Sequence, residues 1–143
     1  MKKILFVCTG NSCRSVMAEG LFRKIVGDRI REFSVASAGV SAADGFPATQ
    51  ETVVVMKEEG VDVSRHRSQR LTPQMIREAD RIFVMEKMHR DMVLELVPEA
   101  KDKISLLTEE QDIPDPIRMS GLFYRNVLSS IRDSVGKIVE GLK

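Results

Sequence analysis

The sequence predicts an α/β fold of three layers, in which a four-stranded parallel sheet carries helices on both faces. Short apolar segments with strand character alternate with helix-like segments along the chain, which is typical of right-handed crossovers between parallel strands. The first apolar run is continuous rather than alternating, as in a strand buried on both faces. The 143 residues, 43% hydrophobic and 30% charged, suit one globular domain, residues 1–143.

The first half of the chain is predicted to contain two strands and two helices. The apolar run 2–8 is the first predicted strand, and residues 15–26 place apolar side chains at helical spacing. Residues 33–39 form the second predicted strand. Residues 47–60 follow as a helix, with proline at its first position and glycine at its end.

The second half is predicted to hold three helices, two strands and a long polar loop. In chain order these are a short helix at 72–80, a strand at 81–85, a helix at 87–98, a strand at 103–107, a proline-rich loop at 108–121 and an amphipathic helix at 122–143. The apolar stripe of the last helix is predicted to consist of Leu122, Val127, Ile131, Val135, Ile138 and Leu142.

Charge and cysteine content exclude several classes of protein. The net charge is +1, from 22 basic and 21 acidic residues, so we expect neither nucleic acid nor a membrane as partner. The apolar run at the start is shorter than the core of a secretion signal, and we expect a cytoplasmic monomer. Cys8 and Cys13 cannot form a disulfide framework, and His66 and His89 have no zinc spacing, so we expect no metal and no cofactor.

The loop that follows the first predicted strand reads CTGNSCRS and has the composition of an anion site. Gly10 permits unusual backbone geometry, and the amides from Thr9 to Arg14 can turn inward in front of a helix N-terminus. Arg14 adds a planar fork of donors that matches two phosphate oxygens. At the base lies Cys8, whose thiolate is favoured by the helix end, by Arg14 and by a hydroxyl such as Ser15. The loop therefore predicts a cysteine nucleophile beneath a bound tetrahedral oxyanion such as inorganic phosphate.

The topology brings a second segment toward this loop. Ligands of parallel sheets bind beyond the carboxyl ends of the strands, and both Cys8 and the segment IPDPI follow strand ends. Asp115 in that segment is a candidate general acid, with Asp112 as the second choice. Because Asp115 stands between two prolines, its local sequence taken alone favours a simple turn.

The longer stretch FVCTGNSCRSVMAEGLF resembles the low-molecular-weight protein tyrosine phosphatase family, and SVASAGV, HRSQRLT, ADRIFVMEKMH and DIPDPI follow in that family's order. The resemblance implies that Cys8 is the nucleophile and that Arg14 binds the phosphoryl oxygens and stabilises the transition state. It implies that Asp115 acts first as general acid and then as general base. The loop residues implied to bind phosphate are Thr9, Gly10, Asn11, Ser12, Cys13 and Arg14.

The resemblance also assigns supporting roles. Ser15 would donate a hydrogen bond to the thiolate, and Asn11, helped by His66, would hold the loop in its strained shape. Cys13 would be a redox partner that can form a disulfide with Cys8; a small packing residue is the alternative at this position. A phosphorylated protein is the implied substrate.

Four positions depart from the pattern of the tyrosine-specific members. Val16 replaces a usual proline, and Ala43 and Ile117 stand where aromatic side chains line the pocket. Ser12 replaces an aliphatic residue and is closer to the threonine of the family's protein arginine phosphatases. We expect a protein tyrosine phosphatase, with a protein arginine phosphatase as the alternative.

Two further functions are less well supported. An arsenate reductase can share this fold and loop, but its thiol relay needs further cysteines, and none follows Cys13 in the sequence. A module that only binds anions needs neither the thiol of Cys8 nor the carboxylate of Asp115.

Overall fold

The computed structural model describes residues 1–142 and has the predicted parallel sheet. Its four strands lie in the order β2-β1-β3-β4 and pair in parallel throughout, which confirms the predicted fold class. The strand bounds are β1 Lys2–Cys8, β2 Phe33–Gly39, β3 Arg81–Val84 and β4 Ile104–Leu106.

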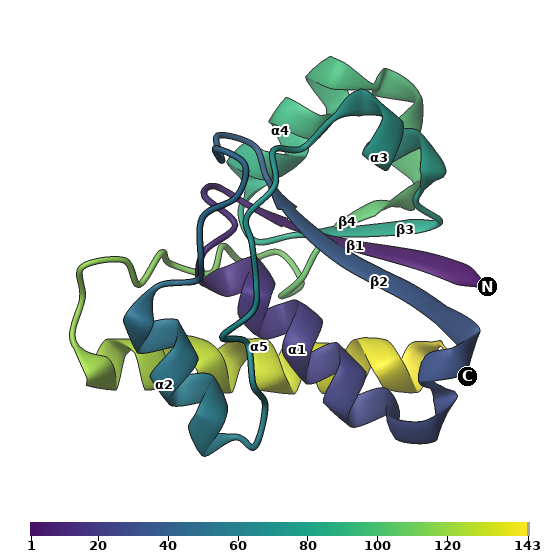
Figure 1. Cartoon of the computed structure of the whole chain (residues 1–143). Helices are drawn as coiled ribbons and strands as arrows, with labels where there is room; N and C mark the ends of the chain where they lie inside the picture. Colours follow the sequence, from purple (N-terminus) through teal and green to yellow (C-terminus); the bar gives the residue numbers. More distant parts are fainter. Residues whose placement is uncertain (143) are drawn as a thin grey trace.

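Helices cover both faces of the sheet (Figure 1). One face carries α1 (Arg14–Val26), α2 (Gln50–Glu58) and α5 (Gly121–Gly141). The other carries α3 (Pro73–Glu78) and α4 (Lys87–Leu96). Two short 3₁₀ segments, Gly27–Glu32 and Pro98–Lys103, precede β2 and β4 and were not predicted.

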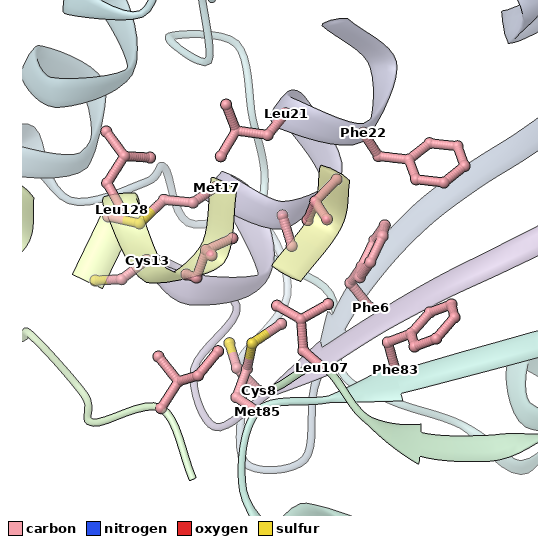
Figure 2. Packing of buried hydrophobic residues seen from close by; sticks show 14 of the residues in the cluster. Phe6, Cys8, Cys13, Met17, Leu21, Phe22, Phe83, Met85, Leu107 and Leu128 are labelled. Atoms are coloured by element: carbon pink, nitrogen blue, oxygen red, sulfur yellow. The ribbon is translucent and has the colours of Figure 1, made fainter. Parts of the chain in front are cut away.

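Strand β1 lies in the middle of the core. Ile4, Phe6 and Cys8 point toward α1 and α5, whereas Leu5 and Val7 belong to the cluster that α3 and α4 cover. This division explains why the strand reads as an uninterrupted apolar run. The rings of Phe22 and Phe83 pack around Phe6 (Figure 2), each with its centroid 5.8 Å from that of Phe6.

Two details of the helices differ from the prediction. Helix α2 begins at Gln50 rather than at Pro47, because the Thr49 hydroxyl accepts the N–H of Thr52 at 3.3 Å and so caps the helix later. In α5 Leu122 is 68% exposed, and Tyr124 is buried instead. Among residues 1–142 no helix combines the length and apolar composition needed to cross a membrane.

Candidate active site

Strand β1 ends at Cys8, and helix α1 starts at Arg14, so the intervening loop lies at the N-terminus of a helix. The Cys8 Sγ lies 2.9 Å from the Ser15 hydroxyl oxygen and accepts the backbone N–H of Asn11 at 3.3 Å. Cys13 occupies the N-cap position without capping the helix through its side chain. The amides of the first turn therefore remain available to an anion, and the buried sulfur of Cys8 lies at the base of the loop.

Asn11 holds the loop in shape. Its φ of 53° is left-handed, and its fully buried side chain compensates for that strain by donating to the hydroxyls of Ser15 at 2.8 Å and Ser37 at 2.9 Å. Its Oδ1 accepts the backbone N–H of Gln69 at 3.0 Å. The Nε2 of His66 lies 2.8 Å from the Asn11 carbonyl oxygen. Asn11, Ser15 and His66 thus belong to one hydrogen-bond network around the loop.

The end of β2 forms the floor beneath this loop. A Cβ added to Gly39 would lie 2.6 Å from the Thr9 carbonyl oxygen and 2.9 Å from the Asn11 backbone nitrogen. The next turn of chain bonds to the loop as well, because Ser41 N–H donates to the Thr9 carbonyl at 2.9 Å. Only glycine at position 39 lets the two segments approach this closely.

Arg14 is buried although it is charged, with 1% of its surface exposed. Its Nη1 donates to the Glu86 carboxylate and to the Ile113 carbonyl, both at 2.6 Å. Its Nη2 lies 3.4 Å from the Thr9 hydroxyl and 3.7 Å from the Asp115 carboxylate. The guanidinium is therefore fixed on one edge and faces the loop and the candidate acid with the other.

The two candidate acids occupy different positions. The Asp115 side chain is 41% exposed; one of its oxygens faces Arg14, and the other accepts the N–H of Ile117 at 3.1 Å. The segment is thus a turn and also brings a carboxylate to the site. Asp112 instead accepts the N–H of Lys87 at 2.8 Å, at the start of α4. These positions favour Asp115 over Asp112 as the candidate general acid.

Cys13 is a free thiol that points away from solvent, in the buried cluster it shares with Cys8 (Figure 2). Its sulfur lies 3.5 Å from both the Tyr124 and Thr49 hydroxyl oxygens and 3.7 Å from that of Ser12. Burial raises the pKa of Tyr124 above its usual range, so its hydroxyl stays protonated.

The mouth of the site has little aromatic surface. Ala43 is exposed, and Ile117 is 45% exposed. Phe46, 61% exposed, lies on the same β2–α2 loop as Ala43, and that loop contacts the phosphate loop where Thr49 N–H donates to the Ser12 carbonyl at 3.1 Å. Tyr124 is fully buried and does not line the mouth.

Sequence reasoning missed four residues of this network: Ser37, Gln69, Glu86 and His89. Glu86 follows β3 closely, so the rule that ligands gather at the carboxyl ends of parallel strands could have found it. The segment around Gln69 is rich in charged and polar side chains, which is typical of a solvated surface, yet the backbone N–H of Gln69 donates to the side chain of Asn11. Within residues 1–142, no group of three or more potential metal-ligating side chains is arranged to hold a metal ion.

Comparison with known proteins agrees with this geometry. A protein-arginine-phosphatase of Geobacillus stearothermophilus is 36% identical, over 99% of this chain and 96% of its own length. A probable low molecular weight protein-tyrosine-phosphatase, EpsP of Ralstonia solanacearum, is also 36% identical, over 94% of this chain and 92% of its own. The structure of Vibrio vulnificus Wzb in complex with benzylphosphonate superposes with a TM-score of 0.90 at 35% identity and covers 98% of both chains. The model of the low molecular weight phosphotyrosine protein phosphatases matches residues 3–143, and the chain belongs to that family of hydrolases.

Proposed function

We propose that this protein hydrolyses phosphotyrosine in protein substrates through a phosphocysteine intermediate, with residues 1–143 acting as one catalytic domain. The observation that carries the proposal is the meeting of three groups at one edge of the sheet. These are the sulfur of Cys8 at the base of an amide-lined loop, the buried guanidinium of Arg14, and the carboxylate of Asp115 at 3.7 Å from that guanidinium.

In the first step the phosphoryl oxygens bind the loop amides from Thr9 to Arg14 and the open edge of the Arg14 guanidinium. The Cys8 thiolate attacks phosphorus, an S–P bond forms, and the bond from phosphorus to the phenolic oxygen breaks. Asp115, in its protonated form, gives its proton to the departing oxygen. The tyrosine side chain of the protein substrate leaves with its hydroxyl restored, and Asp115 is left as a carboxylate.

In the second step a water molecule attacks the phosphocysteine. The Asp115 carboxylate takes a proton from that water as the new P–O bond forms and the S–P bond breaks. Inorganic phosphate leaves, and the Cys8 thiolate is restored. The Ser15 hydroxyl, 2.9 Å from the sulfur, stabilises that thiolate as a leaving group.

The choice of phosphotyrosine is supported by the family and by the apolar side chains on the loops beside the site. The benzylphosphonate bound to Vibrio vulnificus Wzb carries an aromatic ring next to its phosphonate, as phosphotyrosine carries one next to its phosphate. Phe46 and Ile117 offer exposed apolar surface on the loops that flank the site. These observations favour an aryl phosphate.

Phosphoarginine is the second candidate. Ser12 resembles the threonine of the arginine phosphatases, Ala43 provides no aromatic wall, and one relative is itself a protein-arginine-phosphatase. The same two steps apply, with Asp115 protonating a guanidinium nitrogen in place of a phenolic oxygen.

A comparison of peptides that carry phosphotyrosine or phosphoarginine tests both candidates. Wild type should release phosphate from the phosphotyrosine peptide with the higher kcat/KM, and Cys8→Ser should be inactive yet still bind inorganic phosphate in calorimetry. A preference for phosphoarginine by more than about tenfold, roughly 1.4 kcal/mol in the transition state, makes the second candidate correct. Undiminished turnover by Cys8→Ser rules out the phosphocysteine route for either substrate.

A further inference from the structure

The first turn of α4 carries two side chains that serve the helix and the phosphate loop at once. Glu86 and His89 form a reciprocal capping box, in which the Nδ1 of His89 accepts the backbone N–H of Glu86 at 3.0 Å. The Glu86 carboxylate also accepts a hydrogen bond from Arg14, and the Nε2 of His89 lies 2.8 Å from the Thr9 hydroxyl oxygen. The cap of α4 therefore contacts the loop at two points.

The capping bond fixes the protonation of His89. Because Nδ1 accepts a backbone N–H, it carries a lone pair, and the proton of the neutral ring lies on Nε2. Nε2–H therefore donates to the Thr9 hydroxyl oxygen. His89 is fully buried, and this burial, followed by the charge of Arg14, lowers its pKa to about 4. The carboxylates that oppose the shift are those of Glu86, Asp112 and Asp115.

The hydroxyl of Thr9 then has a defined orientation. A hydroxyl has two lone pairs and one hydrogen, and here His89 and Arg14 both direct N–H groups at the oxygen, at 2.8 Å and 3.4 Å. In the part of the chain that the structure describes, the hydrogen of this hydroxyl has no acceptor of its own. Thr9 directly follows Cys8, and the Arg14 nitrogen that approaches it is the one that faces Asp115. The free hydrogen is therefore available to an oxygen of the transferred phosphoryl group.

We propose that His89 is a positioning residue for phosphoryl transfer, a role that rests on the phosphatase function proposed above. It acts through Thr9: it orients the Thr9 hydroxyl as a donor to the phosphoryl group and keeps the Nη2 edge of Arg14 directed toward the leaving group. The role requires a neutral donor at the position of Nε2. A carboxamide of similar reach supplies such a donor, whereas an apolar ring of similar size does not.

Three single variants at two positions and one double variant test this role, with para-nitrophenyl phosphate as substrate. His89→Phe and Thr9→Val should each lower kcat at least tenfold and change KM less than threefold. The double variant should lie within threefold of the worse single variant, because both changes remove the same interaction. His89→Gln, which keeps a donor toward Thr9, should recover kcat to within threefold of wild type.

Thr72→Ala is the matched control. It removes the N-cap of α3, in the same layer as α4, where the Thr72 hydroxyl accepts the N–H of Met75 at 3.2 Å. It should lower the unfolding temperature and leave kcat unchanged, which shows that lost stability alone does not produce the effect.

The proposal is overturned if folded His89→Phe keeps kcat within twofold of wild type. It is also overturned if the fold-losses of kcat in the two single variants multiply in the double variant, or if the kcat of His89→Gln is as low as that of His89→Phe. If His89→Phe does not fold, the kcat of Thr9→Val is compared with that of Thr9→Ser, because serine keeps the hydroxyl. Equal kcat for these two variants also overturns the proposal. If wild type itself does not hydrolyse the aryl phosphate, it is the phosphatase function that fails.

Discussion

Arg14 and Glu86 are 72 residues apart in the chain, and their side chains form an ion pair at 2.6 Å beside the phosphate loop. The Arg14 side chain is 2% exposed and that of Glu86 25%, so solvent screens this pair less than a surface pair. The pair connects the loop after β1 to the segment after β3. The other edge of the guanidinium lies beside the Thr9 hydroxyl and the Asp115 carboxylate, where we propose that the phosphoryl group binds.

Replacement of Glu86 should therefore impair catalysis without any contact to substrate. In Glu86→Gln the amide can still accept one hydrogen bond, but the charge that holds Arg14 is lost. We expect kcat to fall about tenfold and the free energy of unfolding to fall by about 1–3 kcal/mol. Steady-state kinetics and urea unfolding measure the two effects. Equal kcat for variant and wild type would show that Arg14 keeps its orientation without Glu86.

The two aspartates of the loop after β4 should behave differently. Asp115→Asn removes the proposed proton donor and should lower kcat on an alkyl or weakly activated aryl phosphate about 10²- to 10⁴-fold. Asp112→Asn is the matched control, because its contact is to the N–H of Lys87 rather than to Arg14. Its kcat should stay within about threefold of wild type. A larger loss in Asp112→Asn than in Asp115→Asn would reverse the assignment.

Oxidation tests the role of Cys13. Hydrogen peroxide should convert the Cys8 thiolate to a sulfenic acid, which then condenses with the Cys13 thiol to form a disulfide and water. To react, Cys13 must leave its hydrogen bonds to Tyr124 and Thr49. After peroxide and then dithiothreitol, wild type should regain most of its activity, and Cys13→Ser should regain less. If both recover equally, Cys13 is a packing residue only.

Position 12 should influence which phosphorylated residue is preferred. Ser12→Ile makes the loop more similar to tyrosine-specific members of the family. Hydrolysis of a phosphotyrosine peptide should be unchanged or faster, and hydrolysis of a phosphoarginine peptide should slow about tenfold, equivalent to roughly 1.4 kcal/mol. The ratio of the two kcat/KM values is the measurement. An unchanged ratio would remove Ser12 as a determinant of substrate choice.

Stability should depend on pH through His89. Burial and the charge of Arg14 lower its pKa from 6.5 to about 4, against the carboxylates of Glu86, Asp112 and Asp115. The imidazole of His89 therefore binds a proton at higher pH in the unfolded chain than in the folded chain. The contribution of His89 to the free energy of unfolding is therefore complete above pH 6.5 and falls as the pH drops toward about 4. Below that value this contribution does not fall further. The difference in urea unfolding free energy between wild type and His89→Gln should show this slope. A difference that is constant from pH 7 to 4 would contradict it.

Much of the architecture could be predicted because it depends on local patterns. Apolar runs and caps such as Thr72 with Pro73 mark the elements, and their alternation leads to the parallel sheet. The loop from Cys8 to Arg14 could be interpreted because it is continuous in sequence and its residue types suit one chemistry. The resemblance to the family then supplied the roles of Asp115 and His66, which local sequence alone did not decide.

The parts that were missed depend on contacts between distant segments. Glu86 and His89 read as an ordinary helix start, and nothing local shows that their side chains also reach Arg14 and Thr9. Leu122 follows the helical period of α5, yet it lies in the first turn, where 68% of its surface is exposed. A periodic pattern predicts the buried face of a helix but not where the neighbouring elements stop covering it.

The close approach of Gly39 to the phosphate loop makes the active site depend on strand register. Cys8 pairs with Gly39, so a shift of one residue between β1 and β2 would put Ala38 or Val40 beneath the loop. The same shift would exchange the two faces of a strand and move its side chains between separate halves of the core. A chain that mispairs these strands therefore loses much of its stability together with its anion site. The register that makes the chain stable is therefore also the register that gives the phosphate loop its geometry. A stably folded molecule has both.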